Sequence, residues 1–414
     1  MRASSSAPIH KRSIRKRRVF YIPGYDPIHP RRYRELYRKE GADQAKISGY
    51  EIDLKPKRAK GAYGWHVEAQ IDGQQVESDF AVLVWSDIVK HSMGQSIPAT
   101  YLQLLRTAYA YIGSGALFRL MRLRKGPTIA ALYPVVFLLG QLALALIAGR
   151  MAHLAASALL PDALGTGLGV ILGIGLAVMM LRWFRKHDNK VFAYYLMHDY
   201  AYSAQSRGAN PPELEARMAE FGETIAEALQ GDWDEVLVIG HSSGAHLAVS
   251  ILADLIRAGR VPLGPDAPAL GFLSLGQVVP MVSFLPDAQR LRRDLHDLST
   301  RDELAWVDVT APGDGCAFAL CDPVAVSGVA PEGKRWPLVL SAAFTQTLSP
   351  ERWKALRWRF FRLHFQYLCA FDRPADYDYF QITAGPLSLR ERYAGRAPSK
   401  SRIERPENRF TDML

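Results

Sequence analysis

The chain has 414 residues, enough for one large domain or two of average size. Its hydrophobic share of 49% and charged share of 22% are typical of a chain that folds around a core, which excludes collagen, a long coiled coil and wholesale disorder. Lys and Arg number 51 against 41 Asp and Glu, and the formal net charge of +10 suits either nucleic acid or an anionic membrane surface. Three cysteines, Cys316, Cys321 and Cys369, provide neither a disulfide framework nor the CxxC spacing of zinc sites, so we expect a reducing compartment.

The first segment of the chain, residues 1–18, is expected to be a basic tail. Its Lys and Arg residues cluster towards its end: Lys11, Arg12, Arg15, Lys16, Arg17 and Arg18. Such a cluster can bind nucleic acid, attach to anionic lipid headgroups or simply solubilise the chain. The apolar stretches described below favour lipid headgroups. Because no apolar stretch follows the basic residues directly, a signal peptide is not expected.

Residues 19–125 are expected to form the first part of a folded α/β domain. Arg18–Ile22 and Phe80–Ser86 are short apolar runs typical of strands, and the alternating segment Tyr50–Glu77 predicts an edge hairpin. Residues 101–120 combine tyrosines and leucines with two arginines, a pattern that predicts an amphipathic approach to a membrane.

Two long stretches lack charged residues: residues 126–149 and residues 163–181. A helix needs roughly 20 apolar residues to cross ~30 Å of hydrocarbon, so both qualify as membrane spans. The alternative is a pair of buried core helices, which rarely run this long without a charge. We expect a transmembrane hairpin over residues 126–186. Its second span carries a ridge of glycines that suits close approach by the first span or by a second copy of the chain: Gly165, Gly169 and Gly173.

Charge at the ends of the two stretches predicts their orientation. The connection, residues 150–162, has one Arg and one His, whereas both outer ends are basic, with Arg119, Arg122, Arg124, Lys125, Arg182, Arg185, Lys186 and Lys190. The positive-inside rule places both outer flanks, and hence both termini, in the cytoplasm. We therefore expect a bacterial-type inner membrane location with the folded domain on the cytoplasmic side.

Residues 187–414 alternate predicted strands with predicted helices. Four short apolar runs predict strands: Val236–Ile239, Phe272–Leu275, Trp306–Thr310 and Pro337–Ser341. Residues 213–229 place their apolar side chains on one stripe of a helix. Strands that alternate with helices predict an α/β fold, in which a mainly parallel sheet is covered by helices on both faces.

A short motif follows the first of these runs: Gly240, His241, Ser242, Ser243 and Gly244. Gly-x-Ser-x-Gly is common by chance, but here it stands between a predicted strand and an apolar-periodic helix. In that context the small residues two positions either side of the serine relieve the clash of a strained turn, so that its hydroxyl projects at the edge of the sheet. The N-terminus of the following helix can then stabilise developing negative charge. A tight turn without chemistry is the alternative.

On these residues the chain resembles the α/β-hydrolase superfamily, specifically its lipases and esterases. The resemblance covers the two parts outside the hairpin, and the glycine–serine motif is its specific signal. In that family the nucleophilic serine is followed along the chain by an acid and then by a histidine. The resemblance therefore implies an α/β-hydrolase fold with Ser242 as the nucleophile.

The acid that the resemblance implies is Asp314. It stands in a turn just beyond the predicted strand Trp306–Thr310, where the family keeps its acid. Asp308 lies within that strand, and Asp322 precedes a proline and is typical of a turn cap. Both remain alternatives.

The histidine that the resemblance implies is His364. His246 is too close to the serine to reach back to it, and His296 precedes the implied acid, against the family order. One departure stands out, because Ser349–Ala370 reads as a continuous helix whereas the family places its histidine in a loop. Either that helix ends near Arg362, or His364 is a core residue.

The resemblance also implies a pair of backbone amides that hold the oxyanion of the reaction. The glycine-containing loop Ile22–Asp26 directly follows the first predicted strand and is similar to the family's oxyanion loop. The amide of Tyr25 would then join that of Ser243. A plain turn rich in Pro and Gly is the alternative.

Together these features predict a membrane-anchored serine hydrolase that cleaves lipid or other hydrophobic acyl esters through an acyl-enzyme. Acyl transfer to an alcohol by the same triad is one alternative, and a catalytically silent membrane scaffold is another. We expect no metal and no organic cofactor. The expected partners are membrane lipid and a hydrophobic ester. Nucleic acid is not expected, because the positive charge is dispersed and no recognition motif occurs.

Overall fold

A central eight-stranded sheet organises the protein, of which the computed structural model describes residues 13–57 and 61–414. The strands are β1 (Lys16–Ile22), β2 (Glu51–Pro56), β3 (Gly64–Ile71), β4 (Gln74–Val82), β5 (Glu235–His241), β6 (Ala269–Leu275), β7 (Leu304–Thr310) and β8 (Leu338–Ser341). Their order across the sheet is β2-β3-β4-β1-β5-β6-β7-β8. The strands from β4 to β8 in this order run parallel, whereas β2 and β3 form an antiparallel edge. The predicted α/β class with a mainly parallel sheet is confirmed.

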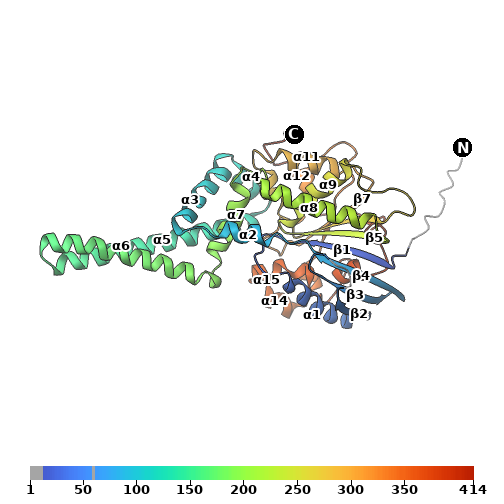
Figure 1. The fold of residues 1–414 in the computed structure, drawn as a ribbon, viewed down its shortest axis with the longest axis horizontal. Helices are drawn as coiled ribbons and strands as arrows, with labels where there is room; N and C mark the ends of the chain where they lie inside the picture. The colour runs from blue at the N-terminus through green and yellow to red at the C-terminus, as the bar shows by residue number, and fades with distance from the viewer. Residues whose placement is uncertain (1–12, 58–60) are drawn as a thin grey trace.

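Helices cover both faces of this sheet (Figure 1). One face packs against α8 (Pro212–Leu229), α9 (Gly244–Arg257) and α11 (Gln289–Leu298) through side chains such as Phe20 and Val238. The other face packs against α1 (Arg31–Ser48), α16 (Tyr379–Ala384) and α17 (Leu389–Arg392) through Tyr21 and Ile239. Neighbouring residues of one strand thus enter opposite cores, as the two-residue period of a β-strand requires.

Shorter helices connect the sheet to the rest of the chain. Those that follow strands or cover their ends are α2 (Ser86–Met93), α10 (Val279–Ser283), α12 (Pro323–Val326), α13 (Phe344–Thr347), α14 (Pro350–Leu356), α15 (Phe360–His364) and the 3₁₀ turn η3 (Gln366–Leu368). Those between the sheet and the two apolar stretches are α3 (Ile97–Ala108), the π-helical turn η1 (Tyr109–Gly113), α4 (Ala116–Leu123), the 3₁₀ turn η2 (Asp188–Lys190) and α7 (Ala193–Ala204).

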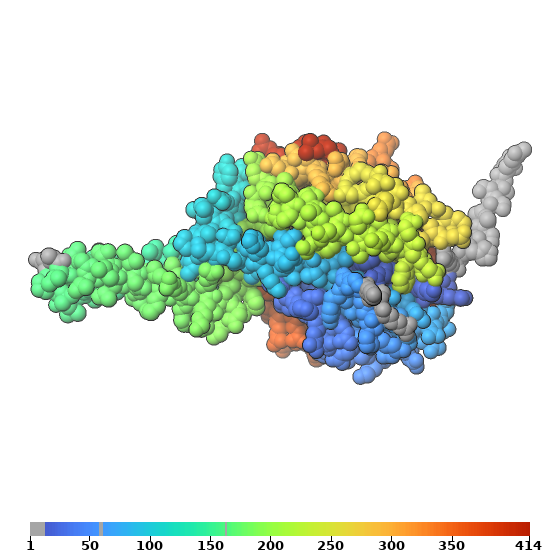
Figure 2. Space-filling model, in the orientation of Figure 1, coloured from blue at the N-terminus to red at the C-terminus, as the bar shows by residue number. Residues whose placement is uncertain are grey.

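The two apolar stretches form a helical hairpin, α5 (Lys125–Leu159) and α6 (Asp162–Lys186). Figure 2 shows it as a narrow stalk that projects from the body of the protein. Both helices are long and apolar enough to cross a membrane, and in their most apolar windows only 22% and 17% of the residues are buried. That is not the burial of a core helix, so the core-helix alternative is wrong.

Close packing inside the hairpin depends on glycine. A Cβ on Gly149 would lie 2.5 Å from Gly173 O, and one on Gly169 would lie 2.9 Å from His153 O. A Cβ on Gly165 would lie 2.9 Å from Leu160 O. The predicted glycine ridge therefore packs against α5 of the same chain, and a second copy as its partner stays a prediction.

The expected connection between the two helices, residues 150–162, is longer than the one in the structure. Helix α5 continues to Leu159, and only Leu160 and Pro161 separate it from α6. The residues after Gly149 are rich in Ala, Leu and Met, which are good helix formers, and Pro161 lacks the backbone donor needed to continue the helix.

The end of the expected basic tail belongs to the folded domain. Arg17 in β1 is fully buried, and its Nε donates to Glu235 Oε2 over 2.6 Å. Arg18 is buried too. Both side chains belong to β1 and are buried in the folded domain, so the tail is shorter than residues 1–18. Two further basic residues of the tail, Lys11 and Arg12, lie outside the described residues.

Two other expected boundaries differ from the structure. Strand β4 ends at Val82 rather than Ser86, because Ser86 already begins α2. The expected continuous helix Ser349–Ala370 is broken into α14, α15 and η3, and His364 is the last residue of α15. Of the two possibilities left open by the sequence, the structure favours a helix that ends close to Arg362, since His364 stands at a helix end rather than within a long helix.

Candidate active site

Ser242 lies in a strained turn between β5 and α9. Its backbone φ is 57°, in the left-handed region that residues with side chains rarely adopt. Two glycines make the turn possible, because a Cβ on Gly240 would lie 2.7 Å from Ala245 Cα and one on Gly244 would lie 2.2 Å from Ile22 O. The turn places the half-buried serine at the carboxyl end of β5 and at the N-terminus of α9.

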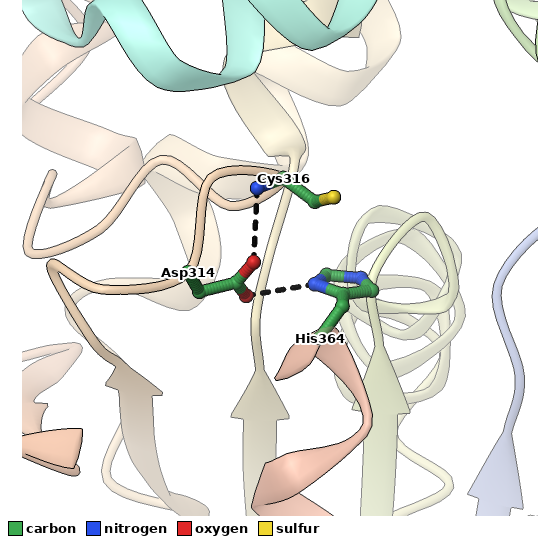
Figure 3. Close-up of side chains that lie close together, drawn as sticks. All are labelled: Asp314, Cys316 and His364. Atoms are coloured by element: carbon green, nitrogen blue, oxygen red, sulfur yellow. Dashed lines mark hydrogen bonds and ion pairs between the residues drawn. The ribbon is translucent and has the colours of Figure 1, made fainter. Parts of the chain in front are cut away.

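The side chains of Asp314 and His364 are joined by a hydrogen bond, as Figure 3 shows. His364 Nδ1 lies 2.7 Å from Asp314 Oδ2. Asp314 follows β7 and His364 ends α15, so the fold brings together two residues that are 50 positions apart. An ionised carboxylate only accepts hydrogen bonds, which assigns the proton of the pair to Nδ1 and leaves Nε2 for another partner.

Ser242 and His364 line one cavity. In the described part of the chain no hydrogen bond joins these two side chains. In enzymes without substrate, the bond between a serine and its histidine is often long and tightens only when substrate binds. The histidine ring has room because Gly276, with φ of 53°, lies against it. A Cβ at Gly276 would lie 3.0 Å from His364 Cε1.

The carboxylate of Asp314 accepts two hydrogen bonds besides the one from His364. Cys316 N donates to Oδ1 over 2.9 Å, and the Tyr367 hydroxyl donates to Oδ2 over 3.0 Å. Burial by itself would raise the pKa of this carboxyl. The charge and hydrogen bond of His364 lower the pKa, the two donors lower it further, and together they outweigh burial. The pKa of Asp314 is therefore lowered, which keeps the carboxylate ionised. Sequence reasoning missed Tyr367, three residues beyond the histidine.

His241 supports the backbone of His364. Its Nε2 lies 3.1 Å from the His364 carbonyl oxygen, and its Nδ1 lies 3.0 Å from the Tyr21 hydroxyl. Because a carbonyl oxygen only accepts, Nε2 carries the proton and Nδ1 accepts from the tyrosine. Burial, followed by the charge of His364, lowers the pKa of His241 to about 3, so it is neutral at physiological pH. The only sequence signal for this role was its place inside the serine motif.

The loop after β1 reaches the serine turn, as the sequence predicts. A Cβ on Gly24 would lie 2.9 Å from Ser242 Cβ, so only a glycine permits this approach. The amide of Tyr25 is not free, however, because it donates to Ser243 Oγ over 2.9 Å. To serve as an oxyanion donor, this amide first has to lose the Ser243 hydroxyl as its acceptor.

The cavity above the serine has a volume of about 420 Å³. Its walls are rich in aromatic side chains: Tyr25, Phe192, Tyr195, Tyr200, Phe361 and Phe365. The hairpin contributes Pro127 from the first turn of α5. Such a chamber, mainly apolar with polar groups beside the candidate serine, has the character of a site for a hydrophobic ligand.

Two carboxyl groups besides Asp314 belong to this region, and they differ in their surroundings. Asp26 accepts from the Tyr33 hydroxyl over 2.6 Å and pairs with Arg32 at 3.3 Å. Asp199, from α7, takes part in no hydrogen bond or ion pair with the described residues, although it lines the cavity. Burial raises the pKa of Asp199 to about 7, partly offset by the charge of His364. Little in the sequence pointed to Asp199 at the site, because it is a single acid within an aromatic segment.

The alternative acids and histidines lie elsewhere or lack suitable partners. Asp308 is buried within the sheet, 2.6 Å from Ser274 Oγ, and burial raises its pKa to about 8. Asp322 accepts from two amides at the start of α12, as a turn cap does. His296, on α11, bonds through Nδ1 to the backbone carbonyl of Val329 and does not line the cavity. His246 lines the cavity, but burial lowers its pKa to about 4 and its Nδ1 has no partner among the described residues.

Asp314, Cys316 and His364 also form the one group of described residues whose ligand atoms could converge on a metal ion, within 4.8 Å of one another. A cation there would have to separate His364 Nδ1 from the carboxylate that accepts its proton. The carboxylate already accepts three hydrogen bonds, so the arrangement favours proton chemistry at His364.

Comparisons of the chain with protein-family models, with curated proteins and with solved structures find no match. The functional interpretation therefore depends on the chain's own geometry.

Proposed function

We propose that the protein is a membrane-anchored serine hydrolase of the α/β-hydrolase type, which cleaves lipid or other hydrophobic acyl esters. The observation that carries the proposal is the bond between His364 Nδ1 and Asp314 Oδ2 in a cavity shared with Ser242, whose backbone is strained. A strained serine beside an oriented imidazole is the arrangement that acyl transfer through a covalent intermediate requires.

In the proposed reaction Ser242 Oγ attacks the ester carbonyl carbon while His364 Nε2 takes the hydroxyl proton. Asp314 stabilises the resulting imidazolium through Nδ1. The tetrahedral oxyanion accepts from the amides of Ser243 and Tyr25, each worth roughly 3 kcal/mol in comparable sites. His364 then gives the proton to the leaving alcohol, which departs as the acyl-enzyme forms.

Water completes the proposed cycle. His364 Nε2 takes a proton from the water, whose oxygen attacks the acyl carbonyl carbon. The ester bond to Ser242 breaks, the proton returns to Ser242 Oγ, and the acid is released. If an alcohol replaced water in this step, the same residues would transfer the acyl group instead.

The hairpin supports the membrane part of the proposal. Its helices meet the length and hydropathy needed to cross a bilayer, and large apolar side chains cover its surface, among them Ile129, Val136 and Ile171. The basic residues at the outer ends favour a cytoplasmic catalytic domain at an inner membrane, next to anionic lipid.

A fluorophosphonate probe tests the nucleophile directly. We expect the full-length chain, in detergent or nanodiscs, to be labelled at Ser242 and Ser242→Ala to resist labelling. Ser203→Ala is a matched control, because Ser203 lines the same cavity, and it should label like the wild type. A wild-type chain that resists the probe and cleaves no ester would point to the silent scaffold. Labelling with product formation only in the presence of alcohols would instead indicate an acyltransferase.

A further inference from the structure

A second hollow lies at the base of the hairpin, next to the catalytic cavity. It has a volume of about 80 Å³ and lies among α3, α4, α5 and α7. Its walls are formed mainly by apolar side chains: Leu104, Leu117, Leu120, Ala131, Val135 and Met197. We call this hollow the basal groove.

The basal groove offers almost nothing to a polar ligand. Among the residues that the structure describes, no charged side chain lines it. Two of its hydroxyls are already bonded within the protein, since Tyr111 donates to Met281 O over 2.9 Å and Thr128 donates to Arg124 O over 3.3 Å. A headgroup placed there would lose its hydrogen bonds to water without replacement. A hydrocarbon chain would lose nothing.

The groove and the catalytic cavity share two wall residues, Tyr200 and Met281. These side chains therefore separate the space above Ser242 from the groove. Met281 has an unbranched side chain that adapts its shape easily. The Tyr200 hydroxyl makes no hydrogen bond within the described part of the chain, so no polar contact holds the ring in place. A partition made of these two side chains can open by rotamer changes alone.

Helix α5 runs along both spaces. Pro127, in its first turn, lines the catalytic cavity, while Thr128, Ala131 and Val135 in the following turns line the groove. The path from the serine thus continues along the helix that the proposed function places in the bilayer. An ester drawn from the bilayer would meet mainly apolar walls along this path.

We infer that the basal groove holds the acyl chain of the ester substrate, with Tyr200 and Met281 as the partition through which the chain reaches the carbonyl at Ser242. The inference rests on the proposed function and makes the substrate class more specific: an ester of a long-chain acid, with its carbonyl at Ser242 and its chain directed towards the hairpin. Each methylene sheltered from water favours binding by roughly fourfold, so preference for long acyl chains should be strong.

A chain-length series tests the groove. The full-length protein is assayed in detergent micelles with p-nitrophenyl esters of two to sixteen carbons. Ala131→Trp fills the groove and should lower the ratio of kcat/KM for the longest over the shortest ester by tenfold or more. Ile129→Trp is the matched control, because Ile129 lies on the same helix but is 64% exposed and is not part of the groove. It should keep the wild-type ratio. An unchanged ratio in Ala131→Trp overturns the inference.

A second measurement does not depend on turnover. A sixteen-carbon fatty acid with a diazirine at the end of its chain is photolysed with the full-length protein. We expect adducts on the peptides of α3 and α4 in the wild type and in Ile129→Trp, with a fall of at least fivefold in Ala131→Trp. Equal labelling in all three proteins contradicts the inference. If the wild type cleaves no ester at all, the proposed function fails, while crosslinking still decides whether the groove binds an acyl chain.

Discussion

Gly126, the second residue of the hairpin helix α5, lies against Gly315, the residue that follows Asp314. A Cβ at Gly126 would lie 3.3 Å from the Gly315 carbonyl oxygen, so the approach leaves little space for any other residue. Arg124 strengthens the junction, because its Nε donates to Ala319 O over 2.8 Å. The start of the hairpin is thus built onto the loop that carries the candidate acid, and removing the whole hairpin would disturb the site.

Substitutions of the three proposed catalytic residues should each be severe. Ser242→Ala, His364→Ala and Asp314→Asn are expected to lower kcat for an ester by roughly 10⁴. Because the three act as a unit, Ser242→Ala combined with His364→Ala should be little worse than the more damaging single change. Steady-state kinetics with a soluble ester measure both effects. Wild-type activity in His364→Ala would remove that residue from the mechanism.

Tyr367→Phe should slow the reaction without weakening substrate binding. The change removes the hydroxyl that donates to Asp314 Oδ2, a hydrogen bond to a charged acceptor worth about 1.5–3 kcal/mol. We expect kcat to fall by about tenfold or more with KM nearly constant. Tyr379→Phe is the matched control, because Tyr379 is buried in the same core but does not bond to Asp314. An equal loss in both variants would show a general effect on packing.

Ser243→Ala is expected to increase activity. The Ser243 hydroxyl accepts the Tyr25 amide in the resting protein, and removing the hydroxyl frees that amide for the oxyanion. A neutral hydrogen bond is worth about 1 kcal/mol, so kcat/KM should rise by up to about fivefold. Ser92→Ala, which removes a contact to the hydroxyl of Tyr25 and not to its amide, should give no such rise. A large fall in Ser243→Ala would exclude this role for the hydroxyl.

Asp199→Asn should stabilise the protein above neutral pH. Burial raises the pKa of Asp199 to about 7 from its ordinary 3.8, so the folded state resists ionisation of this carboxyl. The free energy of unfolding therefore falls as the pH rises between these two values, and the full penalty, up to a few kcal/mol, is present above pH 7. Asn removes the penalty. We expect the Tm of the variant minus that of the wild type to be larger at pH 8 than at pH 4.

The exposed Asp266→Asn serves as the control for that comparison. If both variants gave the same difference in Tm at both pH values, the penalty at Asp199 would be refuted.

The proposed topology predicts which residues are reached from outside the inner membrane. Leu159 at the tip of the hairpin is 82% exposed, and Leu263 on the α/β domain is 75% exposed. In a background without the three native cysteines, Leu159→Cys should react with an impermeant maleimide from outside. Leu263→Cys should react only after the membrane is disrupted. Reaction of Leu263→Cys in intact cells would place the catalytic domain on the other side.

Much of the fold could be predicted from local patterns. The mainly apolar runs at Val236–Ile239 and Trp306–Thr310 lie within β5 and β7, because strands buried on both faces are rich in apolar residues. The serine turn could be anticipated because glycines stand two residues before and two residues after Ser242, between an apolar run and an apolar-periodic helix. Local patterns also place the hairpin, since a stretch without charge is rare in other settings.

The rest depends on contacts between distant segments. Sequence reasoning treated Arg17 as part of a basic tail at lipid headgroups, and only its bonds to Glu235 and to the carbonyls of Gly385 and Leu387 explain why the guanidinium is buried. The support of His364 by His241 joins positions 123 residues apart and leaves no periodic signal. The engagement of the Tyr25 amide by Ser243 is equally invisible in the sequence, because it depends on how closely two loops approach.

Helix α5 has 35 residues and is therefore about 52 Å long, whereas the hydrocarbon of a bilayer is ~30 Å thick. In the proposed orientation the uncharged residues 126–149 cross the hydrocarbon, so the excess length lies at the far end of the helix, and Pro127, which lines the cavity, stays near the membrane surface. Under the proposed function, the ester would have to be extracted from the bilayer only as far as the headgroup level before cleavage. Extraction is easier from loosely packed or strongly curved membranes, so turnover should depend on lipid packing as much as on the chemistry of the scissile bond.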